Sequence, residues 1–157
     1  MGRLGDASLV RRSGLLLIAV AVAATGCGGR DPLPRACLDG PRPVAAALRS
    51  APGPVALRGG TRLSQCVELA FGQGELQEVG VIYMQVGTAL AAQVSRSDAA
   101  ALQLGYLVGA TRRGAGRTNG VALEMMRRIE VVVGPEGPPA HRRAAYQRGL
   151  AAGARGG

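Results

Sequence analysis

Apolar residues recur every three or four positions through most of the chain after residue 60, which is the spacing of one face of an α-helix. Glycine or proline interrupts this pattern at several points. The pattern predicts helices over residues 63–70, 75–95, 99–110, 118–133 and, with a thinner apolar face, 138–150. We therefore predict an all-α fold, a small bundle of four to five helices, over residues 61–152, with a disordered tail at 153–157.

Two of these segments are expected to form the centre of the domain. The segment 75–95 carries an apolar stripe made of Leu76, Val79, Tyr83, Val86 and Leu90. Val81, Ile82 and Val94 widen that stripe, so we expect contacts from more than one side. The segment 99–110 is apolar around most of its circumference and should be central. Its Gly105 and Gly109 leave a smooth strip that we expect to face another helix closely, most plausibly 75–95.

A different pattern opens the chain, with basic residues, then an uncharged apolar run, then small residues before a cysteine. Arg11 and Arg12 precede the apolar run 14–24, which is shorter than the roughly 20 residues that span a bilayer as a helix. The order basic, apolar, small is typical of a secretion signal. Residues 1–26 are therefore predicted to be a signal peptide that directs export.

The boundary Ala24-Thr25-Gly26-Cys27 resembles the lipobox of bacterial membrane lipoproteins, although leucine is commoner than alanine at the first of these positions. The resemblance covers about the first 27 of 157 residues and identifies a processing class rather than a fold. It implies that Cys27 receives a diacylglyceryl group, becomes the first mature residue and is often further acylated, for example with palmitate. The protein is then expected to be anchored by lipid to a bacterial membrane, facing the periplasm or the cell exterior.

Residues 27–60 are rich in proline, glycine and arginine and are predicted to be a tether. The prolines that interrupt long helices here are Pro32, Pro34, Pro41, Pro43, Pro52 and Pro54. One short helical turn is expected over 43–49. If Cys27 is lipidated, Cys37 and Cys66 remain as an even pair in an oxidising compartment, which predicts a disulfide that pins the tether to the first helix.

The chain is strongly basic, with 19 basic residues against 10 acidic ones and a formal net charge of +9; all the basic residues are arginines. Without residues 1–26, 16 arginines face nine acidic residues, a net charge of +7. A basic domain at a membrane surface is attracted to anionic lipid or wall polymer. Nucleic acid is not expected as a partner, because export places the domain on the other side of the membrane.

Two glycines lie between basic residues in the segment 112–117. Guanidinium groups and backbone N–H groups of such a loop can surround an anion. The candidate anion-binding residues are Arg112, Arg113 and Arg117. The alternative is a solvated turn at the C-terminal end of a helix, where basic residues interact favourably with the helix dipole. Such residues attract anions only through their net charge. If the site exists, replacing its arginines should weaken anion binding more than replacing Arg35, Arg42 and Arg49 of the tether.

The remaining polar residues suggest no catalytic set, so the chain is not expected to be an enzyme. The only histidine, His141, has no obvious carboxylate partner, and no nucleophile-elbow, metal or cofactor motif is present in the sequence. We interpret the exported chain as a non-enzymatic interaction or structural module whose partner is an unknown envelope protein. The alternative function is a binder or sensor of an anionic ligand or surface through the basic loop.

Overall fold

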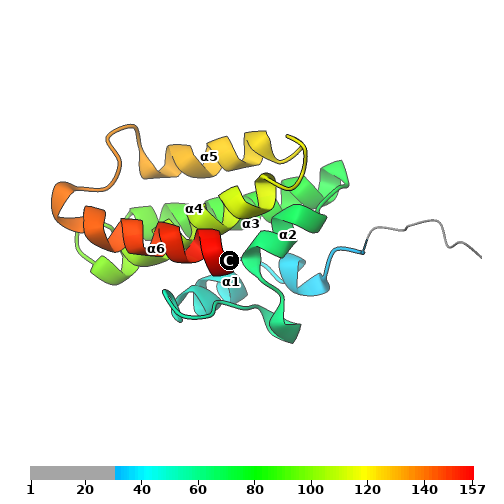
Figure 1. Cartoon of the computed structure of the whole chain (residues 1–157), viewed down its shortest axis with the longest axis horizontal. Coiled ribbons are helices and arrows are strands. Elements are labelled where there is room, and N and C mark those ends of the chain that lie inside the picture. Colours follow the sequence, from blue (N-terminus) through cyan, green and yellow to red (C-terminus); the bar gives the residue numbers. More distant parts are fainter. Residues whose placement is uncertain (1–30) are drawn as a thin grey trace, which may run out of the picture.

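Helix α4 (Asp98–Ala115) lies at the centre of the fold, which a computed structural model describes for residues 31–157 (Figure 1). The other α-helices of these residues are α1 (Pro41–Leu48), α2 (Leu63–Leu69), α3 (Gln73–Ala91), α5 (Leu123–Val133) and α6 (Arg143–Gly156). Three short 3-10 helices span Arg35–Leu38, Arg58–Gly60 and Ala140–Arg142. The predicted signal peptide 1–26 and Cys27 lie outside the described residues.

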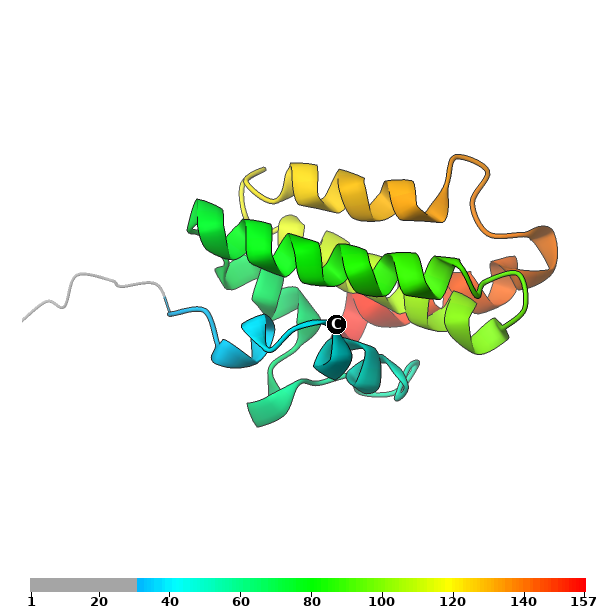
Figure 2. The same cartoon turned by 180° about the vertical axis from the view of Figure 1, so that it is seen from behind.

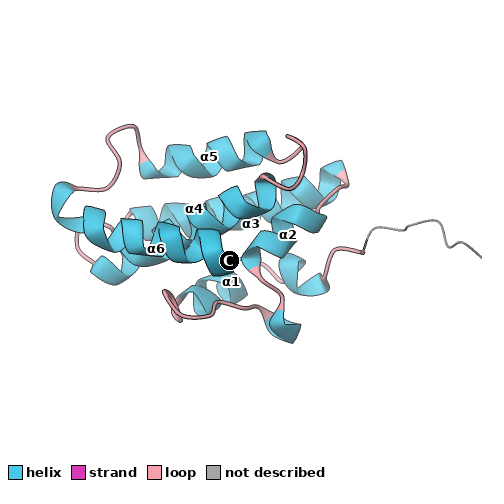
Figure 3. Cartoon of the chain, viewed as in Figure 1, coloured by secondary structure: helices cyan, strands magenta, loops and turns pink. Residues whose placement is uncertain are grey.

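Helices and loops make up the whole of residues 31–157, without a strand (Figure 3), so the all-α prediction is confirmed. These residues hold six α-helices where four to five were expected, because α1 forms within the predicted tether. None of the helices in this part of the chain is both long and apolar enough to cross a membrane.

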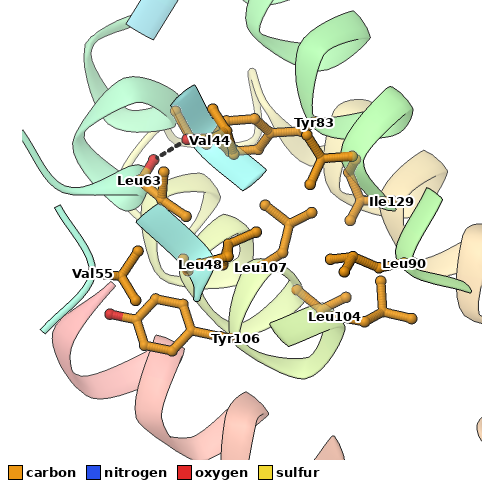
Figure 4. Close-up of a cluster of buried hydrophobic side chains, with 14 of the residues drawn as sticks. Val44, Leu48, Val55, Leu63, Tyr83, Leu90, Leu104, Tyr106, Leu107 and Ile129 are labelled. Atoms are coloured by element: carbon orange, nitrogen blue, oxygen red, sulfur yellow. Dashed lines mark hydrogen bonds between the residues drawn. The ribbon is translucent and has the colours of Figure 1, made fainter. Parts of the chain in front are cut away.

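Side chains from the surrounding helices pack against α4 in the core. Leu104 and Leu107 of α4 are buried with Leu90 of α3 and Ile129 of α5 (Figure 4). Tyr83 of α3 is fully buried, and its hydroxyl donates a hydrogen bond of 2.7 Å to the carbonyl oxygen of Leu63. The predicted apolar stripe of α3 is therefore largely the buried face. Of the residues expected to widen it, Ile82 and Val94 are buried, whereas Val81 is 49% exposed.

Helices α4 and α6 contact each other through their backbones. An ideal Cβ atom placed on Gly105 would lie 2.9 Å from the nitrogen of Leu150, and one on Gly109 would lie 2.8 Å from the nitrogen of Ala154. Real Cβ atoms essentially never come within 3.0 Å of such atoms. The two glycines thus face another helix closely, as expected, but that helix is α6 rather than α3. Residue numbers of the contacting pairs increase together along both helices, so α4 and α6 run parallel.

Helix α6 extends to Gly156, whereas the sequence predicted disorder from residue 153. Gly153 continues the contact with α4, since a Cβ atom there would lie 2.9 Å from the nitrogen of Ala110. The hydroxyl of Ser64 on α2 donates a hydrogen bond to the carbonyl oxygen of Gly157. These contacts hold the last turn of the helix between α2 and α4.

The predicted tether also differs, because from Leu33 onward it folds against the bundle. Val44 and Leu48 of α1 are fully buried in the core. The two prolines in the first turn of α1 occupy positions where a missing N–H costs no helical hydrogen bond, so they start the helix rather than prevent it. The predicted disulfide is present: Cys37 and Cys66 are bonded, with their Cα atoms 5.4 Å apart.

Candidate binding groove

The segment 112–117, called the basic turn below, is partly helical, because α4 continues to Ala115. Arg112 forms an ion pair with Glu130 of α5, with 2.6 Å between Nε and Oε1. Arg117 forms an ion pair with Glu68 of α2, with 3.1 Å between Nη1 and Oε2. Two of the three predicted anion-binding arginines therefore already contact carboxylates, and these carboxylates lie on different helices.

The third arginine of the basic turn, Arg113, contacts the end of α6. Its Nη1 donates to the carbonyl oxygens of Ala154 and Arg155 at 3.0 and 2.9 Å. The last carbonyls of a helix have no partner within the helix and carry its partial negative charge, so a guanidinium there stabilises the helix end. Arg113 thus joins the ends of α4 and α6.

The structure does not bring the three predicted arginines to one hollow, since none of them lines either of the two grooves described below. An anion bound at the basic turn would have to compete with Glu130 and Glu68. The segment has the contacts of a structural turn at a helix end, which was the alternative interpretation of its sequence.

A groove of about 540 Å³ is lined by residues of α1, α3 and the start of α4. The ribbon of α3 lies toward the viewer in Figure 2, with α1 below it. The volume of the groove is in the range of small-molecule sites. Besides Pro41, its apolar lining consists of six small or aliphatic residues, called the floor below: Ala45, Val86, Ala89, Leu90, Ala99 and Ala100. The polar lining comes from Arg42, Arg49, Gln85, Gln93, Ser97 and Gln103. We call this hollow the α1 groove.

The local sequence explains why each helix contributes as it does. In α1, Val44 and Leu48 are four residues apart and enter the core, which places Arg42, Ala45 and Arg49 on a different stripe that faces the groove. Alanines at the contact positions of all three helices leave space that larger side chains would fill. The expected N-cap, Ser97, fixes the start of α4 by accepting a hydrogen bond from the Ala100 N–H at 3.1 Å.

The α1 groove is positively charged, and its arginines have no carboxylate partner within residues 31–157. Within residues 31–157, neither Arg42 nor Arg49 forms a hydrogen bond or an ion pair through its side chain, and no acidic residue lines the groove. The carboxylate nearest in sequence to the α4 side of the groove is Asp98, which pairs with Arg142 at 2.9 Å. Arg42 and Arg49 belong to the segment predicted to be the tether. The spacing of Val44 and Leu48 is the signal in the sequence that this segment forms a packed helix.

A second groove, of about 460 Å³, lies beside the first 3-10 helix and is lined by Arg35, Asp39, Arg58 and Thr61 among others. Arg58 and Asp39 form an ion pair across it, with 2.7 Å between Nη2 and Oδ2. Its charges are therefore partly satisfied within the protein, in contrast to those of the α1 groove.

The residues that carry acid-base chemistry lie elsewhere. His141 is exposed and its Nε2 lies 3.4 Å from the carbonyl oxygen of Ser95. Burial raises the pKa of the phenols of Tyr83, Tyr106 and Tyr146 above the ordinary value of 10, and none of them lines the α1 groove. The ring of Tyr106 lies beside Val55 in the core (Figure 4). Among residues 31–157, no three His, Cys, Asp or Glu residues come together as metal ligands would.

The fold and the groove define the described part of the chain as a small helical domain with one disulfide and an open, positively charged hollow. Comparisons with protein-family models, with curated proteins and with solved structures found no match.

Proposed function

We propose that this protein is a lipoprotein of the bacterial envelope whose helical domain is a non-enzymatic binding module. The lipobox-like boundary at Cys27 supports the anchor. The disulfide between Cys37 and Cys66 supports an oxidising compartment, where such bonds persist.

The composition of the α1 groove is the single observation that carries the binding function. An apolar floor with a few polar groups around it is typical of ligand sites. Its polar groups are guanidinium, amide and hydroxyl groups, and arginine stays protonated at any physiological pH. Such a lining can hold and orient a ligand, but it offers no group that gains and loses a proton near neutrality.

The position of the domain relative to the proposed anchor also supports binding at the membrane surface. Leu33 packs against the core, so the folded domain begins six residues after Cys27 in the sequence. Six extended residues reach at most about 20 Å. A lipid on Cys27 would therefore keep the domain close to the head groups, by a segment shorter than the tether predicted over residues 27–60.

The alternative function, sensing of an anionic ligand through the basic turn, has less support. Glu130 and Glu68 occupy two of its guanidinium groups, and Arg113 is used at the end of α6. An anion would gain little there, because it would replace contacts that the protein already makes.

The anchor is tested by expressing the full-length protein in bacteria with a clickable palmitate analogue. We expect the wild-type protein to carry the label and to sediment with membranes, and Cys27→Ser to lose both properties. The double variant Cys37→Ser/Cys66→Ser should keep the label, which would assign the label to Cys27. An unlabelled wild-type protein whose mature N-terminus lies elsewhere would contradict the proposal.

A further inference from the structure

We propose that the α1 groove binds one anionic phospholipid of the membrane that carries the protein, with an acyl chain on the apolar floor and the phosphate between Arg42 and Arg49. This inference rests on the proposed function as a binding module and names its ligand. It moves the anion site from the basic turn to a helix that the sequence had assigned to the tether.

The acyl chain is accommodated by the floor of the groove. All six floor residues are alanine, valine or leucine, contributed by α1, α3 and α4. An acyl chain on this floor would remove apolar surface from water on both partners, which favours binding. The glutamines of the rim offer amide donors and acceptors for the ester and glycerol oxygens that join chain and phosphate.

The head group is selected by charge. Arg42 and Arg49 are seven residues apart along α1, a rise of about 10 Å, so their long side chains can approach one phosphate from two sides. A guanidinium group donates two parallel hydrogen bonds to a phosphate. Because neither arginine has a partner within residues 31–157, a phosphate there displaces no contact within the protein.

The same charges argue against two other occupants. The diacylglyceryl group proposed on Cys27 is uncharged, so it would leave both guanidinium groups unpaired. A cationic amphiphile would be repelled by Arg42 and Arg49, and the lining has no carboxylate to compensate for that repulsion. An anionic lipid would contact the apolar floor with its acyl chain and the two arginines with its phosphate. The short segment between the proposed anchor and the domain would hold the groove near the membrane that contains this lipid.

The full-length protein in vesicles of zwitterionic phospholipid allows a direct test, because the chain contains no tryptophan. The variant Gln85→Trp places a fluorophore on the rim, and Gln147→Trp places one on the exposed face of α6 as a matched control. A small fraction of anionic phospholipid with brominated chains is then added as quencher. We expect the Gln85→Trp emission to fall at least several-fold more than that of Gln147→Trp.

Charge variants in the Gln85→Trp background then test the head group. Arg42→Gln/Arg49→Gln should reduce the quenching to the level of the α6 control, while Arg112→Gln/Arg117→Gln should leave it unchanged. Gln93→Trp, at another point on the rim, repeats the measurement in case Gln85→Trp disturbs the fold, and circular dichroism checks each variant.

Three results would overturn the inference: equal quenching of the rim and α6 fluorophores, equal quenching by brominated zwitterionic lipid, or no quenching at either rim position. The palmitate label is measured on the same preparations. A labelled protein without rim quenching would reject the lipid site and leave the proposed anchor intact, whereas an unlabelled protein would reject the anchor.

Discussion

The arginines of the basic turn and those of α1 carry the same chemical group in opposite surroundings. Arg112 and Arg117 contact Glu130 and Glu68, and their guanidinium groups are already part of the fold. Those on α1 line a groove without any acidic residue. A cluster of basic residues along the sequence therefore indicates a ligand site only if the folded protein leaves those residues unpaired beside a hollow.

This contrast separates two roles that composition cannot distinguish. Surface ion pairs contribute at most about 1 kcal/mol each, so the basic turn gains modest stability from its arginines. Arginines without an ion pair at a groove give the fold no charge-charge contact, and their guanidinium groups stay available to an anion. Substitutions in the two sets should therefore affect different measurements.

The largest effect should follow removal of the disulfide, which ties the segment leading to α1 to α2. The variant Cys37→Ala/Cys66→Ala opens a closed loop with a sequence separation of 29, which the chain-entropy model values at roughly 3–4 kcal/mol. Chemical denaturation should show this loss. Hydrogen exchange should rise first in α1, with the basic turn still protected; equal exposure of both regions would contradict the separation.

The next largest effect should come from Gly149→Leu, which disturbs the contact between α6 and α4, the helix that ends in the basic turn. A Cβ atom on Gly149 would lie 2.9 Å from the nitrogen of Tyr106, so a leucine must push α6 away from α4. We expect a loss of about 1–3 kcal/mol in the free energy of unfolding. Ala151→Leu, on the exposed side of the same helix, is the control and should be nearly neutral. Similar losses in both variants would argue against the backbone contact.

A smaller effect is expected from Arg113→Gln, because glutamine cannot supply the positive charge at the end of α6. Loss of the charge-assisted hydrogen bonds to Ala154 and Arg155 should reduce the free energy of unfolding by about 1–2 kcal/mol. Arg148→Gln, on the exposed face of α6, is the matched control. If the two variants unfold at the same denaturant concentration, Arg113 does not stabilise the C-terminal end of α6.

The smallest effects compare the paired and unpaired arginines directly. Arg112→Gln and Arg117→Gln should each lower the free energy of unfolding by less than about 1 kcal/mol, and this loss should shrink at high salt. Arg42→Gln and Arg49→Gln should leave it unchanged within error. Thermal unfolding at low and high salt provides the measurement, and a larger loss from the α1 variants would mean that they serve the fold.

The sequence predicts the part of the fold that depends on large apolar side chains. Helical spacing locates α2 to α5, Ser97 marks the start of α4, and the even pair of cysteines predicts the disulfide. The apolar pattern does not predict how α6 packs on α4, because the contact includes Gly149 and Gly153 and glycine adds no side chain to an apolar stripe. There the contact is made by backbone atoms that only the absence of a Cβ atom allows to meet.

The candidate site was harder to predict for a related reason. The α1 groove is a space left by alanines on three helices, and no single segment of the sequence contains it. The pairing of Arg112 with Glu130 and of Arg117 with Glu68 joins residues 18 and 49 positions apart. Whether an arginine is paired depends on how the helices meet, so the sequence alone could not show that Arg112 and Arg117 are ion-paired and that Arg42 and Arg49 are not.

The central claim is that Arg42 and Arg49, rather than the basic turn, bind an anionic lipid. Its most direct test is a calorimetric titration of octyl phosphate into the full-length protein in discs of zwitterionic lipid, with empty discs subtracted. We predict binding at least about tenfold tighter than that of inorganic phosphate or octyl glucoside, which lack the chain and the charge respectively. This preference should disappear in Arg42→Gln/Arg49→Gln and persist in Arg112→Gln/Arg117→Gln. The reverse pattern, or equal losses in both double variants, would contradict the claim.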